Sequence, residues 1–262
     1  MTSRAGLSRQ SRARHWILAA AAVIVVASLL PPGGTQARRY VFAESLQFAL
    51  FAIVVPALIV LGAPWRLGRR SRDLASRIAA ARRDRPAFLR AAAYLVVFAG
   101  ASVTWRLPAA VDALARQPGL AAGELATLLI AGTGLWLEIA ESPPLAPRIA
   151  RWQRAVVAAL AMWTIWVLAY ILGFSRVAWY PAYRHVAGRG LSTIADQQIA
   201  TGTLWAAAAF CFLPVIFYSA MTWLRDTEDP DDELRGVVRR ERHRAWATGS
   251  PRPPRGDDTY PG

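Results

Sequence analysis

The sequence predicts an all-α, polytopic integral membrane protein: a bundle of about six transmembrane helices with both termini in the cytoplasm. The chain has 262 residues and is 55 % hydrophobic, and its 31 basic residues are all arginine. Its apolar residues gather in stretches that mostly reach about 20 residues, the length needed to cross a hydrocarbon core about 30 Å thick. The stretches are 16–30, 42–62, 91–107, 121–137, 156–175 and 199–224.

The orientation follows from the arginines, which fall mainly on alternate connections. Of the 31, 24 lie in the leader, the second and fourth connections, and the tail. Cytoplasmic loops carry the excess of arginine in membrane proteins, so these segments are expected in the cytoplasm and the other connections outside. The net charge of +14 is thereby attributed to contact with lipid head groups, and no nucleic acid is expected as a partner.

The chain divides into a basic cytoplasmic leader (1–15), a transmembrane helical domain (16–225) and a charged cytoplasmic tail (226–262). The leader and the short stretch 16–30 resemble a signal peptide, with small residues at 35–37 as a cleavage site. We expect an uncleaved first helix. The tail ends in a segment rich in Pro, Gly and Asp, which predicts disorder because it cannot build a core.

Three further local features can be predicted. The third stretch is short, so it is expected to include Phe88 and Leu89, with Arg90 reaching toward the head groups. Segment 66–90 holds nine arginines with apolar residues at helical spacing. It is interpreted either as an amphipathic helix on the cytoplasmic leaflet or as a solvated basic loop. Pro56 and Pro214 lie within spans and should kink them.

Polar residues within or beside the spans are the candidates for function, because ionisable groups are costly in lipid. They are expected at one depth, near the outer boundary of the membrane, with Arg106 paired with at least one carboxylate. Near an interface such groups can also be hydrated or cap helix N-termini, and Asp196 is well explained as the cap of the helix that follows it. The candidates are Glu44, Gln47, Arg106, Glu124, Tyr180, Tyr183, Asp196, Gln197 and Gln198.

Several kinds of site lack the residues they need. The histidines, His15, His185 and His243, all lie outside the spans, so haem ligation by two histidines within the membrane has no ligands. The single cysteine, Cys211, excludes a disulfide within the chain. The outer carboxylates and amides suit copper poorly. Because no nucleophile–base pair or glycine-rich phosphate loop is found, we expect no catalytic residue, no metal site, no cofactor and no enzymatic activity.

Particular strings resemble the CtaG-type cytochrome c oxidase assembly factors, polytopic proteins implicated in delivering copper to haem–copper oxidases. The resemblance covers about 41–225, and its most specific parts are YPAY at 180–183 and DQQIATGTLW at 196–205. It implies haem–copper oxidase subunits as partners besides the lipid bilayer. It also implies a multi-pass location in the bacterial plasma (inner) membrane, and it alone suggests copper as a ligand.

The chain departs from this family at its histidines. Gln47 and Glu124 match polar positions of the family patterns, but the neighbouring histidines are replaced. The replacing residues are Glu44, Phe48, Arg106, Ala121 and Leu125. The family also often has seven spans where six are expected here. The chain is therefore interpreted as a divergent member that assists oxidase assembly without holding copper in the family's way.

Two alternatives to an assembly factor stay open at this point. One is a small-molecule or ion transporter that uses the outer carboxylates and amides. Transporters usually place their sites near mid-membrane within repeated halves, and no repeat is visible in this sequence, which disfavours transport. The other is a structural membrane subunit without chemistry of its own.

Overall fold

The computed structural model describes residues 4–83, 86–117, 119–184 and 190–227, and in these ranges the chain forms helices and no strands. Six helical segments are long and apolar enough to cross a membrane, which confirms the predicted all-α bundle of six spanning helices. They are Arg12–Leu29, Val41–Arg66, Ala87–Arg106, Gly119–Ile139, Arg151–Phe174 and Thr193–Arg225. The expected tail from residue 228 onward, together with His185 and His243, lies outside the described residues.

The first two spans are built from several pieces. Helix α1 (Arg4–Leu29) begins within the segment expected as a leader, and the short α2 (Gly33–Ala37) follows it. The second span consists of α3 (Val41–Ala49), a π-helical turn η1 (Leu50–Val54) and α4 (Val55–Gly62). Pro56 has no N–H to donate to Ala52, and the chain changes to π hydrogen bonding just before it, with Val55 N–H donating to Leu50.

The remaining helices follow in order along the chain. The 3₁₀ turn η2 (Pro64–Arg66) leads to α5 (Arg69–Ala81), and α6 (Ala87–Arg106) is the third span. Helix α7 (Pro108–Arg116) is short, and α8 (Gly119–Ile139) and α9 (Arg151–Phe174) are spans four and five. The 3₁₀ turn η3 (Pro181–Tyr183) precedes α10 (Thr193–Thr227), a continuous α-helix despite Pro214.

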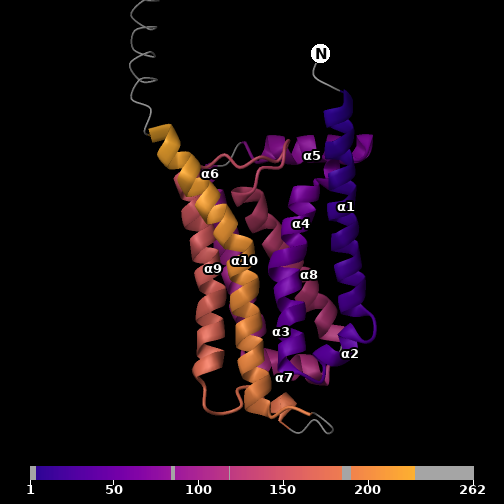
Figure 1. Ribbon diagram of the computed structural model, residues 1–262, viewed down its shortest axis with the longest axis vertical. Helices are drawn as coiled ribbons and strands as arrows, with labels where there is room; N and C mark the ends of the chain where they lie inside the picture. The colour runs from indigo at the N-terminus through magenta and orange to yellow at the C-terminus, as the bar shows by residue number, and fades with distance from the viewer. Residues whose placement is uncertain (1–3, 84–85, 118, 185–189, 228–262) are drawn as a thin grey trace, which may run out of the picture. The chain divides into compact units, whose positions relative to one another are not determined.

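The short helices mark the two ends of the bundle formed by residues 4–220. Figure 1 shows α2, α7 and the α9–α10 connection at one end, which we call the α7 end. Helix α5 and the first turns of α1 lie at the opposite end, the α5 end. The alternate connections thus lie at opposite ends, as six successive spans require.

Segment 66–90 contains a helix, α5, as one of the two interpretations expected. Its Ala75 is buried against the bundle, whereas Leu74 and Ile78 are 60 % and 43 % exposed. Exposed leucine and isoleucine beside arginines are typical of a helix that lies at a membrane surface. The prediction for Arg90 is wrong: its side chain does not reach the head groups but is buried, because it forms an ion pair with Glu138.

The core runs through the middle of the bundle, between α3–α4, α6, α8, α9 and α10. Trp136 of α8 stacks on Phe212 of α10 at 5.4 Å, and Phe98 of α6 meets the same ring edge-on. A second cluster, which includes Val41, Val111 and Leu172, lies beside Tyr180 and Tyr183 at the α7 end. This second cluster supports the polar residues described next.

Candidate functional site

A buried ion pair joins α3 and α6 at the α7 end. Arg106 donates from Nη1 to Oε2 of Glu44 at 2.7 Å and from Nη2 to Oε1 at 3.1 Å, a two-pronged contact. Its Nη1 also donates to the hydroxyl of Ser45 at 3.0 Å. The guanidinium lies 4.1 Å from the centre of the Phe48 ring, where a cation–π contact is favourable. The expected pairing of Arg106 with a carboxylate is therefore confirmed.

The chain positions both partners through helix ends. Arg106 is the last residue of α6, and the extended Leu107 and then Pro108 start α7 in a new direction. Glu44 lies in the first turn of α3, where the helix dipole favours a negative charge. Phe48 comes four positions after Glu44 and three after Ser45, so it shares a helix face with both. All three side chains contact the guanidinium of Arg106.

Glu124 of α8 is the second carboxylate of this region, and it is 5 % exposed. Among the residues that the structure describes, none donates a hydrogen bond to its Oε1. An ionised carboxylate without partners is costly in a buried place. Oε1 of Glu124 is therefore an acceptor that a hydrogen-bond donor in this region can satisfy.

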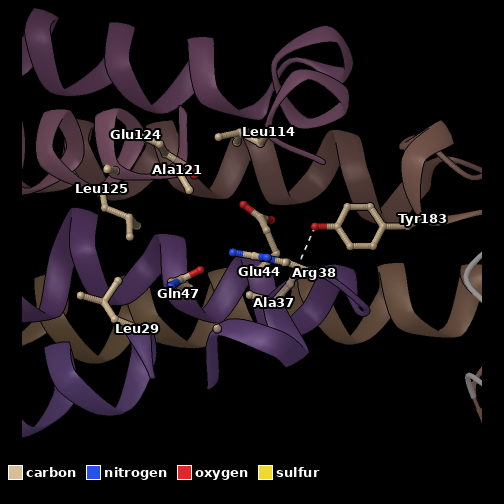
Figure 2. A pocket seen from close by; sticks show the side chains of 12 residues that line it. Leu29, Ala37, Arg38, Glu44, Gln47, Leu114, Ala121, Glu124, Leu125 and Tyr183 are labelled. Carbon is tan, nitrogen blue, oxygen red and sulfur yellow. Dashed lines mark hydrogen bonds between the residues drawn. The ribbon is translucent and has the colours of Figure 1, made fainter. Parts of the chain in front are cut away.

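A cavity of about 300 Å³ lies between Glu44 and Glu124. Figure 2 shows the side chain of Glu124 extending toward it from α8 and that of Glu44 from α3. Gln47 and Arg38 also line it, and Leu29, Leu114 and Leu125 add apolar surface. The cavity thus places two acidic groups and one exposed arginine around a space large enough for several water molecules.

Asp196 has a different role from the one expected. It lies in the first turn of α10, but its carboxylate accepts hydrogen bonds from the backbone N–H groups of Val41 and Phe42, both at 2.9 Å. It therefore caps α3 from another helix. Asp196 was expected to cap its own helix, but its carboxylate binds the first N–H groups of α3 instead. These N–H groups have no partner within α3 and lie against the first turn of α10.

The three candidate glutamines have different surroundings and do not form one group. Gln197 is buried and holds the α9–α10 connection, since it accepts from Trp179 N–H at 2.8 Å and donates to the Leu172 carbonyl at 2.7 Å. Gln198 is exposed. Gln47 donates to the Ser28 carbonyl at 3.0 Å and so ties α3 to α1.

Both tyrosines of the 180–183 run are buried and donate hydrogen bonds to backbone carbonyls. Tyr180 donates to Arg106 at 3.2 Å, and Tyr183 donates to Ala37 at 2.9 Å; Figure 2 marks the second bond. Burial raises the pKa of both phenols above the ordinary value for tyrosine. Both therefore keep the proton that their hydrogen bonds need.

A family model for the cytochrome c oxidase caa3 assembly factors matches residues 1–226. The chain belongs to this family. A comparison with curated proteins and one with solved structures found no match. The resemblance inferred from the YPAY and DQQIATGTLW strings is thereby confirmed, and the chain is a multi-pass membrane protein of an oxidase assembly family.

Glu44, Arg106 and Glu124 form what we call the polar cluster of the α7 end, and these residues do not fit copper. No group of three or more His, Cys, Asp or Glu side chains that could hold a metal is found in the described part of the chain. Glu44 and Glu124 offer hard oxygen atoms, whereas Cu(I) prefers sulfur and imidazole. Both oxygen atoms of Glu44 already accept hydrogen bonds from Arg106, so a metal ion would have to displace this ion pair.

One buried charged group at the α5 end was not predicted from the sequence. Glu138, the residue before the last of α8, is fully buried and contacts Arg82 and Arg90. A signal was present: Glu138 ends one span and Arg90 begins another at the same end of the bundle, so the two charges lie at similar depth. The apolar stretches 91–107 and 121–137 leave both residues in connections, so hydropathy does not predict that they pair.

Proposed function

We propose that this chain promotes cytochrome c oxidase assembly from within the bacterial plasma membrane, by non-catalytic contact with oxidase subunits and without retaining copper. The observation that carries the proposal is the Arg106–Glu44 ion pair, together with family membership. Both residues stand where the resemblance implies histidines. An ion pair holds α3 and α6 together where metal coordination would otherwise do so.

Oxidase assembly, in this proposal, depends on the polar cluster. Arg106 is bonded both to Glu44 of α3 and, through its backbone carbonyl, to Tyr180, so α3, α6 and the α9–α10 connection meet at one point. A change there would alter the surface of the whole α7 end, where we propose that an oxidase subunit binds. The orientation proposed from the arginines puts this end outside and both termini in the cytoplasm.

Transport receives no support from the position of these residues. A transporter site usually lies near mid-membrane, between repeated halves. Here the buried charges lie at the ends of spans, with Glu44 in the first turn of α3 and Arg106 at the end of α6. Midway along their spans, Phe98, Leu128 and Ile165 belong to an apolar core.

The experiment is complementation of a strain that lacks this chain, with assembled oxidase measured by the haem a difference spectrum and by oxygen consumption. Glu44→Gln and Arg106→Gln should each strongly reduce assembled oxidase, because each leaves a buried charge unpaired. The double variant should recover part of it. Arg116→Gln removes an exposed arginine from the neighbouring α7 and serves as the matched control.

Copper is tested separately on the purified wild-type chain. Less than one copper per chain should remain after challenge with a Cu(I) chelator. One tightly held copper per chain would overturn the copper part of the proposal. Full oxidase assembly in both single variants, at normal protein levels, would overturn the role of the polar cluster.

A further inference from the structure

At the α5 end, one carboxylate is shared by two arginines in the interior of the bundle. Glu138 is 0 % exposed. It accepts from Arg90 Nε at 2.7 Å, from Arg90 Nη2 at 2.9 Å and from Arg82 Nη2 at 2.6 Å. Arg82 also donates to the carbonyls of Leu137 and Leu145. This group of three holds an excess positive charge, since two cations face a single anion.

The excess charge faces a cavity of about 210 Å³. Arg82 and Arg90 line it from inside, and the exposed Arg83 and Arg148 line it at the rim. The rest of its described lining comes from Ala79 and the loop 144–147, and no carboxylate is among these residues. Buried Nε of Arg82 has no hydrogen-bond partner among the described residues. The donors and the charge therefore call for an anion with several acceptor oxygens.

An apolar groove begins at the same two arginines. Arg82 and Arg90 also line a second cavity, of about 550 Å³, whose other lining residues are Pro86, Tyr94 and apolar residues of α5 and α6. Leu89 and Val97 line it and remain 63 % and 54 % exposed. Because α6 spans the membrane, this groove runs from the charged cavity along a surface that meets lipid tails.

We propose that this end of the bundle binds an anionic glycerophospholipid, with its phosphate at Arg82, Arg83 and Arg148 and an acyl chain along α6. Charge complementarity selects the head group, because guanidinium groups bind phosphate through paired hydrogen bonds. Basic pockets between transmembrane helices bind such head groups at the cytoplasmic surface. The site lies at the α5 end, and it does not depend on the function proposed for the α7 end.

The test is native mass spectrometry of the full chain, released from micelles that hold equal amounts of phosphatidylglycerol and phosphatidylcholine with identical acyl chains. The wild-type chain should retain phosphatidylglycerol in preference. Arg83→Gln with Arg148→Gln should weaken that retention by roughly tenfold or more, since each arginine near a membrane surface contributes measurably to binding anionic lipid. These two side chains are exposed and outside the Glu138 ion pairs, so folding should be preserved, which circular dichroism melting checks.

The matched control is Arg70→Gln with Arg77→Gln, which removes the same charge from exposed positions of α5 that do not line either cavity. Retention should stay at the wild-type level. An equal loss in both double variants would show diffuse attraction to arginines and would overturn the proposal. Displacement of the lipid by millimolar inorganic phosphate would show a site for free anions and would overturn the choice of a lipid.

Discussion

The carboxylate of Asp196, in the first turn of α10, lies 2.9 Å from the backbone nitrogen of Val41, the first residue of α3. The two residues are 155 positions apart, and the contact joins the second and sixth spans. The N–H groups that begin a helix have no partner within it. Asp196 supplies this partner from a different helix and so fixes where α3 starts.

Replacement of Asp196 by alanine should therefore destabilise the protein. Loss of a helix cap costs about 1–2 kcal/mol, and here the buried N–H of Val41 and the partly buried N–H of Phe42 both lose their partner. The free energy of unfolding in detergent micelles is the measurement. Gln198→Ala, two residues along on the exposed face, should change it by less than about 0.5 kcal/mol. Equal effects of the two changes would contradict the capping role.

Glu138→Gln should have a larger effect. It leaves Arg82 and Arg90 buried without their countercharge, and breaking a buried ion pair from one side costs roughly 3–5 kcal/mol. Glu141→Gln is the control, because Glu141 pairs with Arg154 at the surface, with 62 % of its side chain exposed. An exposed pair contributes at most about 1 kcal/mol. The free energy of unfolding in micelles is the measurement for both variants. Equal losses for Glu138→Gln and Glu141→Gln would contradict the prediction.

Gly132→Ala should destabilise the protein by disturbing the packing of α8 against the second span. A Cβ at Gly132 would collide with the carbonyl oxygen of Ala52 and with the ring of Pro56, and backbone atoms yield little. Overpacking of this kind costs about 1–3 kcal/mol. Gly100→Ala, in α6 with open space around it, should leave stability unchanged or raise it slightly, since alanine favours helices. A stable Gly132→Ala protein would mean that the helices can part at no cost.

The proposed orientation predicts which residues a membrane-impermeant maleimide can reach in intact cells. In a Cys211→Ser background, which has no other cysteine, Leu191→Cys should be labelled from outside because it precedes α10 at the α7 end. Ala80→Cys, in α5, should be labelled only after the membrane is permeabilised. The reverse pattern would overturn the orientation inferred from the arginines.

The sequence alone determined the class of the molecule, because lipid imposes a local requirement. Every backbone polar group within the hydrocarbon region must be satisfied inside its own segment, so six apolar stretches of sufficient length predict six helices. The pairing of Arg106 with a carboxylate could also be predicted. Both residues had to lie at one depth, and leaving either unpaired within the membrane would be costly.

Only the tertiary structure decided which side chains meet. Asp196 could cap its own helix as far as spacing shows, and its actual partner, Val41, depends on how α10 packs against α3. Arg90 could extend to the lipid surface from its place in the sequence, yet the packing of α6 against α8 buries it on Glu138. Hydropathy is a property of each segment. The rotation of each helix about its axis is set by close contacts such as Gly132 against Ala52, which no single segment contains.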